Sequence, residues 1–121
     1  MKDHRGQVVL VNYWATWCGP CREEMPGLVR LSQELGPKGL AVVGVSVDEG
    51  SREKVQQFVD EFHVTYPVAL QEPMSQMAQG MAGVPTTILV DRQGRVAKTY
   101  VGAVGERDFR QDVKILLAEG R

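Results

Sequence analysis

The spacing of apolar and polar residues changes several times along the chain, and each spacing predicts a kind of element. Residues 7–14, QVVLVNYW, form a continuous apolar run of strand length that is rich in β-branched side chains. Such a run predicts a central strand buried on both faces. The run at 40–48 predicts a second buried strand. A short run at 66–70 predicts a third strand, which Pro67 should place near an edge of the sheet.

Between these strands, apolar residues recur at the spacing of helices. The first helix should run from Cys18 to the GPKG sequence at 36–39, with a kink at Pro26. Its apolar positions are Met25, Leu28, Val29 and Leu35. A second helix should be capped by Ser51. Its apolar face would consist of Val55, Phe58, Val59 and Phe62.

The remaining third of the chain predicts a short helix, a hairpin and a closing helix. Met74, Met77 and Met81 indicate the short helix, and we interpret these methionines as core filler. Residues 86–101 should form a hairpin with Asp91 and Gly94 at the first and fourth positions of a type I turn. The closing helix, 106–119, would bury Phe109, Val113, Leu116 and Leu117. Strands that alternate with helices predict an α/β fold with a mixed central sheet flanked by helices.

Length and charge limit the classes of function. The chain has 121 residues, 43% of them hydrophobic, and no change of composition, so we expect one domain over 1–121. We also expect a monomer. Its net charge is only −1, with both signs interspersed, which disfavours nucleic acid as a partner. No apolar run approaches the ~20 residues of a membrane span, so this segment should not insert into a membrane.

The two cysteines of the chain, Cys18 and Cys21, stand in the sequence CGPC where the first strand meets the first helix. Residues three apart on a first helical turn have Cα atoms about 5 to 6 Å apart, which suits a disulfide. The unpaired N–H groups of the helix start favour a thiolate at Cys18, the candidate nucleophile. Cys21, one turn further on, is the candidate resolving thiol. The redox-active group would be this disulfide, without a separate cofactor.

Other interpretations of the pair are less favourable. A purely structural disulfide that closes so short a loop would constrain the unfolded chain very little. A zinc site needs about four ligands, and His4 and His63 are the remaining candidates, so we expect no metal site. A module that handles Cu(I) or Zn through Cys18 and Cys21 stays open as an alternative.

The segment WATWCGPC resembles the active site of thioredoxins, and VPT at 84–86 resembles the loop that carries their cis-proline. The resemblance implies a thioredoxin fold and a cis bond between Val84 and Pro85, opposite the disulfide. It further implies that Val84 pairs, backbone to backbone, with a substrate segment. The substrate-binding residues would be Trp17, Gly19, Pro20, Val84 and Pro85. Trp17 and Pro85 would flank an exposed Cys18 sulfur.

Nearly the whole chain resembles one branch of that family, the TlpA and ResA group, which includes the CcmG reductases of cytochrome c maturation. The resemblance rests on the segments GQVVLVNYWATWC, VVGVSVDE, YPV and VPTTILVDRQGRV. It also rests on an extra helix and strand inserted at about 49–72. The resemblance implies a reductase of protein disulfides that is recharged by an upstream electron donor. It also implies an extracytoplasmic location, in which the full-length protein is tethered to a membrane.

Two departures concern proton transfer and reaction class. Where simple thioredoxins carry a buried Asp, this chain has Asn12, which cannot titrate. Glu24 lies three residues after Cys21, on the same helix face, and matches the acidic residue beside the disulfide in ResA-like proteins. We therefore predict that Glu24 exchanges protons with Cys21, and a solvated glutamate on the helix surface stays open as the alternative. A redoxin-type peroxidase is the alternative enzyme. In that class the peroxidatic cysteine follows a Pro and a Thr at fixed offsets. Thr16 is present here, but no Pro occurs among residues 7–17, which disfavours a peroxidase.

Overall fold

The structure of the chain, a computed structural model, describes residues 6–48, 52–70 and 83–119. These residues form a sheet of five strands with the order β3-β2-β1-β4-β5. The strands are β1 (Val8–Trp14), β2 (Leu40–Ser46), β3 (Val68–Leu70), β4 (Thr86–Val90) and β5 (Val96–Val101). The α-helices are α1 (Gly19–Leu35), α2 (Arg52–Glu61) and α4 (Glu106–Ala118).

The sheet is mixed, as the sequence predicts. β1 lies at its centre, parallel to β2 and antiparallel to β4. β3 is parallel to β2 at one edge, and β5 is antiparallel to β4 at the other. Six of the seven residues of β1 are buried and Val11 is half-buried, which agrees with a strand covered on both faces.

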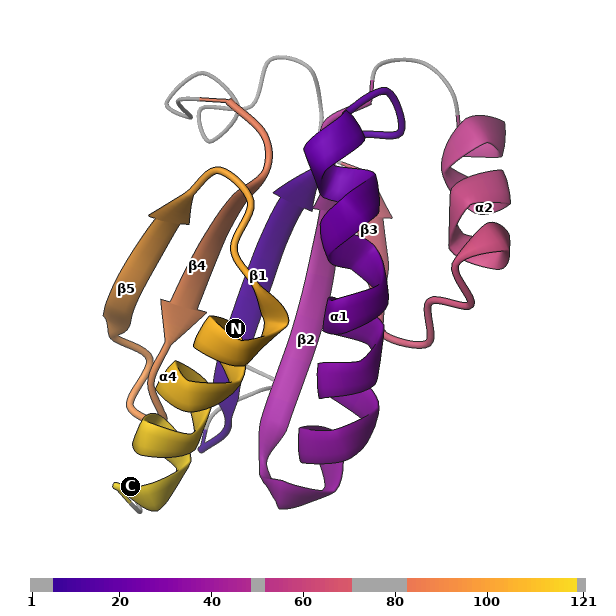
Figure 1. Ribbon diagram of the computed structural model, residues 1–121. Helices are drawn as coiled ribbons and strands as arrows, with labels where there is room; N and C mark the ends of the chain where they lie inside the picture. The colour runs from indigo at the N-terminus through magenta and orange to yellow at the C-terminus, as the bar shows by residue number, and fades with distance from the viewer. Residues whose placement is uncertain (1–5, 49–51, 71–82, 120–121) are drawn as a thin grey trace.

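The three helices are arranged around this sheet (Figure 1). α1 and α4 lie side by side over one face, and α2 lies beyond α1, towards the edge formed by β3. The inward side of α1 contributes six residues to the hydrophobic core at helical spacing. Its buried apolar residues are Cys21, Met25, Leu28, Val29, Leu31 and Leu35. The first turn of α1 thus lies at the end of the sheet where β1 stops, and this end carries the site.

Element ends follow from local chemistry. α1 ends at Leu35 and is followed by a short 3₁₀ turn over Gly36–Lys38. Gly39 closes that turn with a φ of 115°, which favours glycine. The hairpin turn is as predicted, since Gly94 N–H donates to the Asp91 carbonyl at 3.0 Å.

Some predicted boundaries differ by one or two residues. β2 ends at Ser46 rather than at residue 48, because Asp48 turns towards the loop after β1. β3 begins at Val68, after Pro67, whose ring nitrogen cannot donate to the sheet although its carbonyl accepts from Gly44 N–H at 2.9 Å. α4 ends one residue before the predicted end.

The predicted core needs only small corrections. Val59, Phe62 and Leu117 are half-buried rather than fully buried, and they pack against the outside of the main cluster. α1 continues through Pro26, so the kink stays a prediction. The predicted cap at Ser51 and the helix with Met74, Met77 and Met81 lie outside the described residues.

Candidate active site

The CGPC segment begins the first turn of α1. Cys18 is the N-cap residue, with an extended backbone, and its sulfur accepts the Cys21 N–H at 3.2 Å. Pro20 lies at the start of the helix, where a missing N–H costs nothing. Cys18 and Cys21 form a disulfide, and their Cα atoms are 5.3 Å apart, as the spacing predicts. A negative sulfur at position 18 would be stabilised by this N–H and by the helix dipole.

The residues around the disulfide differ sharply in exposure. The Trp17 side chain is 69% exposed, and Gly19 and Pro20 are also exposed. Cys21 is 1% exposed, as expected for a resolving thiol. Cys18, however, is only 5% exposed, so the prediction of an exposed sulfur is wrong for the disulfide form. The surface at the site is therefore formed by the neighbours of Cys18 rather than by its sulfur.

Cys18 lies against the segment Val84–Pro85, which the sequence predicts to lie opposite the disulfide. The Val84–Pro85 bond is cis, and the Val84 carbonyl oxygen lies 3.7 Å from Cys18 Sγ. Val84 is half-buried and Pro85 is buried. The Pro85 carbonyl accepts from Gly102 N–H at 2.8 Å, which fixes the segment to the end of β5. The proposed recognition residue and the nucleophile are thus neighbours.

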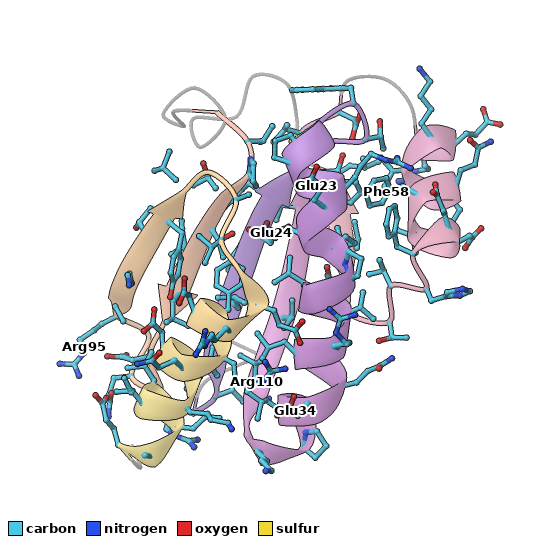
Figure 2. The ribbon with its side chains drawn as sticks, viewed as in Figure 1. Glu23, Glu24, Glu34, Phe58, Arg95 and Arg110 are labelled. Carbon is cyan, nitrogen blue, oxygen red and sulfur yellow. A yellow bond between two sulfur atoms is a disulfide. The ribbon has the colours of Figure 1, made fainter. Side chains whose placement is uncertain are left out.

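Glu24 is buried beneath the disulfide, with 8% of it exposed. Figure 2 shows Glu24 on the side of α1 that faces the segment leading into α4, whereas Glu23 lies on the outer surface. Its Oε2 accepts the backbone N–H of Val104 at 2.8 Å, and its Oε1 accepts from Asn12 Nδ2 at 3.2 Å. The alternative of a solvated surface glutamate is therefore excluded.

Asn12 extends this contact into a short buried chain of polar groups. Its Nδ2 also donates to Thr87 Oγ1 at 2.9 Å, so one amide links a helix carboxylate to β4. Burial raises the pKa of the Glu24 carboxyl, and the hydrogen bonds from Val104 and Asn12 offset part of that rise. The pKa of Tyr66 is also raised, by burial first and by the negative charge of Glu24 second.

The inserted helix α2 is joined to the active-site helix next to Cys21. The Arg22 guanidinium lies 5.2 Å from the ring centroids of both Phe58 and Phe62, and it forms an ion pair with Glu61 at 2.9 Å. Figure 2 shows Phe58 between α2 and α1. Phe58 also packs on Trp14, the last residue of β1, with ring centroids 4.4 Å apart. The insertion is therefore part of the framework around the disulfide.

Sequence reasoning missed a second carboxylate at the site. Asp48 is buried at the ends of β1 and β2 and accepts hydrogen bonds from Thr16 and Ser46. A usable signal was present, because polar residues that follow parallel strands gather at one edge of a sheet, where α/β proteins place their sites. The backbone N–H of Val104 was also missed, and no residue type marks a backbone donor.

Two further structural findings concern metals and membranes. Over residues 6–48, 52–70 and 83–119, no group of three or more His, Cys, Asp or Glu side chains is arranged to hold a metal ion. In the same described part of the chain, no helix is both long and apolar enough to cross a membrane.

Comparison with known proteins agrees with this geometry. The family model described as Redoxin matches residues 1–116. The thioredoxin-like protein YneN of Bacillus subtilis is 33% identical over 117 residues, which cover 95% of this chain and 68% of YneN. The thiol-disulfide oxidoreductase ResA of Geobacillus thermodenitrificans is 32% identical over 115 residues, 94% of this chain and 66% of ResA. The chain thus spans about two thirds of the length of these relatives.

Solved structures show the same relationship. A thiol:disulfide interchange protein of the thioredoxin family from Chlorobium tepidum has a TM-score of 0.88 at 30% identity, over 96% of this chain and 83% of that one. A DsbF homologue from Corynebacterium diphtheriae has a TM-score of 0.86 at 34% identity, over 95% of this chain and 75% of the homologue. Fold, CGPC geometry and relatives agree with the predicted class: the chain belongs to the redoxin family and, within it, to the ResA-like thiol-disulfide oxidoreductases of the thioredoxin fold.

Proposed function

We propose that this chain reduces disulfide bonds in other proteins by dithiol-disulfide exchange. The observation that carries the proposal is the asymmetry of the two cysteines. Cys18 is the N-cap of α1 and receives the Cys21 N–H, whereas Cys21 lies inside the helix and is 1% exposed. One sulfur is placed to be a stabilised thiolate and the other to be shielded from outside reagents.

The reaction follows from that placement. The Cys18 thiolate attacks one sulfur of the substrate disulfide, a mixed disulfide forms, and the first substrate thiolate leaves. The Cys21 thiolate then attacks Cys18 Sγ, the Cys18–Cys21 disulfide forms, and the second substrate thiolate leaves. Two electrons have passed from the protein to the substrate. An upstream dithiol donor returns them by the same exchange in reverse.

Glu24 supplies the proton acceptor for the second step. Cys21 must lose its proton while it is buried, and burial opposes the formation of a thiolate. Glu24 lies one helical turn after Cys21, and burial raises the pKa of its carboxyl, which makes its carboxylate a stronger proton acceptor than that of an ordinary glutamate. The S–H proton of Cys21 passes to the Glu24 carboxylate as the Cys18–Cys21 bond forms.

Substrate contact is made by the exposed residues around Cys18. Trp17, Gly19 and Pro20 form one side, and the Val84 backbone forms the other. Because Val84 lies directly beside the sulfur, an extended substrate segment that pairs with it brings its disulfide to Cys18. The finer parts of the proposal are a monomer that acts outside the cytoplasm and a protein substrate that is an apocytochrome, another oxidoreductase or a general pool of proteins.

Single substitutions of the two cysteines test the assignment. Cys18→Ser should lose reduction of protein disulfides and form no mixed disulfide. Cys21→Ser should accumulate a mixed disulfide through Cys18, because the resolving thiol is missing. Mass spectrometry of the trapped species from cells then identifies the substrate. Faster alkylation of Cys21 than of Cys18 in the reduced protein would contradict the proposed order of attack.

A further inference from the structure

A second buried carboxylate lies behind the active-site loop, and the exchange reaction does not use it. Asp48 follows β2 by two residues and is 7% exposed. Its Oδ2 accepts the Thr16 backbone N–H at 3.0 Å, and its Oδ1 accepts the Thr16 hydroxyl at 2.6 Å. Ser46 Oγ donates to Oδ2 at 2.6 Å from the opposite side. One side chain therefore holds both polar donors of a single loop residue and is itself held by β2.

These contacts join the loop between β1 and α1 to the sheet. The regular pairing of β1 with β2 ends at Trp14, whose carbonyl accepts the Val47 N–H at 2.8 Å. Beyond that point the chain turns on itself, since Cys18 N–H donates to the Ala15 carbonyl at 3.2 Å. The bonds of Thr16 to Asp48 connect this turn to the end of β2.

Trp17 and Cys18, the last two residues of this turn, are the ones that meet substrate in the proposed reaction. Trp17 is 69% exposed, although a large apolar side chain gains free energy by leaving water. Its position, and that of Cys18, depends on how firmly the preceding residue is held. Thr16 is that residue, and Asp48 holds it.

We propose that Asp48 is a positioning residue that fixes the active-site loop for disulfide exchange. The inference rests on the proposed function and extends it. When the disulfide opens, the covalent link between Cys18 and Cys21 is lost, whereas the hydrogen bonds of Asp48 involve neither sulfur. These bonds hold Thr16 in both redox states. Their contribution is therefore largest for reactions that start from the reduced protein, in which Cys18 must attack a protein disulfide.

Hydrogen exchange of the Thr16 amide tests the loop contact without any substrate. Asp48→Ala removes both acceptor oxygens, so neither the Thr16 N–H nor the Thr16 hydroxyl keeps its partner. In the reduced variant the Thr16 amide should exchange at least about tenfold faster than in the reduced wild type, because a protecting acceptor is lost. An unchanged exchange rate would overturn the proposal.

Kinetics then test whether the contact matters for exchange. With the disulfides of insulin as the probe, kcat/KM of Asp48→Ala should fall about tenfold, because small errors of position are costly in a bimolecular attack. Alkylation of Cys18 by iodoacetamide, at a pH where the thiol is fully ionised, should change less than about threefold, because a small reagent needs little alignment. An unchanged kcat/KM, or an equal fall in both rates, would overturn the proposal.

Two sets of control variants separate the loss of the Thr16 contact from a general loss of folding or charge. Thr16→Val loses the hydroxyl contact, whereas Thr16→Ser retains it, so only Thr16→Val should slow insulin reduction, and this pair decides the matter if Asp48→Ala fails to fold. Asp60→Ala makes the same substitution on α2, where Asp60 accepts from Gln56, and should leave both rates unchanged. Wild-type protein that fails to reduce insulin would refute the proposed function, while exchange of the Thr16 amide would still decide the role of Asp48.

Discussion

Glu24 on the active-site helix and Asp48 behind the active-site loop are both buried carboxylates, yet they are held by different parts of the molecule. The donors to Glu24 are 12 residues before it and 80 residues after it in the sequence. The donors to Asp48 lie at the ends of β1 and β2, and two of them belong to one residue, Thr16. Glu24 thus joins distant elements around a group that can carry a proton, whereas Asp48 fixes the course of one loop. The source of the donors, more than burial, separates the two roles.

The largest expected effect on stability comes from Asp48→Ala. The substitution leaves the Thr16 N–H and two hydroxyl groups without their acceptor, so the free energy of unfolding should fall by about 2–4 kcal/mol. Urea denaturation measures the change. Ser46→Ala removes the two hydrogen bonds between the Ser46 hydroxyl and Asp48, leaves the Thr16 contacts intact and should cost about 1–2 kcal/mol. Equal losses for the two variants would mean that the Thr16 contacts add nothing to stability.

The second prediction places a like charge beside Glu24. Asn12→Asp replaces the amide that donates to Glu24 with a carboxylate, so the two carboxyl groups would hold one proton between them. At neutral pH the free energy of unfolding should fall by about 1–3 kcal/mol and recover as the pH is lowered. Thr87→Val breaks only the other hydrogen bond of Asn12 and should show no such recovery. A loss of stability that does not depend on pH would show that Glu24 is not charged beside position 12.

The smallest effect concerns Glu24 itself. Because burial raises the pKa of its carboxyl in the folded state, the folded protein binds the proton more tightly than the unfolded chain. Stability should therefore decrease as the pH rises from the ordinary glutamate value of 4.5 through the raised pKa, and remain lower above it. Glu24→Gln should remove this contribution. Urea denaturation of both proteins across that pH range measures the difference.

The same variant tests proton transfer. In stopped-flow measurements, resolution by Cys21 should be slower in Glu24→Gln, and its dependence on pH should be displaced from that of the wild type. If the resolution rates of Glu24→Gln and wild type depend on pH in the same way, water or another group accepts the proton and Glu24 has only a structural role.

The strands, the active-site helix and its cysteines could be predicted because their signals are local. The apolar run before Trp14 and the spacing of Cys18 and Cys21 depend on neighbouring residues alone. The cis bond at Pro85 followed from the resemblance of a short motif. Such local patterns can be interpreted without knowing how distant segments of the chain pack.

The polar contacts at the site could not be predicted in the same way, because they depend on strand register. Asn12 meets Thr87 because the two residues are paired between β1 and β4, and directly opposed residues place their side chains on the same face. A shift of one residue would separate them. Similarly, Asp48 reaches Thr16 only because Trp14 is paired with Ser46. Apolar patterns predicted the strands but left these registers open.

The hydrogen bond from the Val104 N–H to Glu24 allows the protonation of a buried carboxyl to be measured by NMR. Val104 belongs to the segment between β5 and α4, and its amide proton points at the carboxylate at 2.8 Å. The resonance of that amide must shift when the carboxylate gains or loses a proton, because the charge of its acceptor changes. One peak in an NMR spectrum thus follows the ionisation of Glu24 in the unaltered protein, in either redox state and without a label at the disulfide.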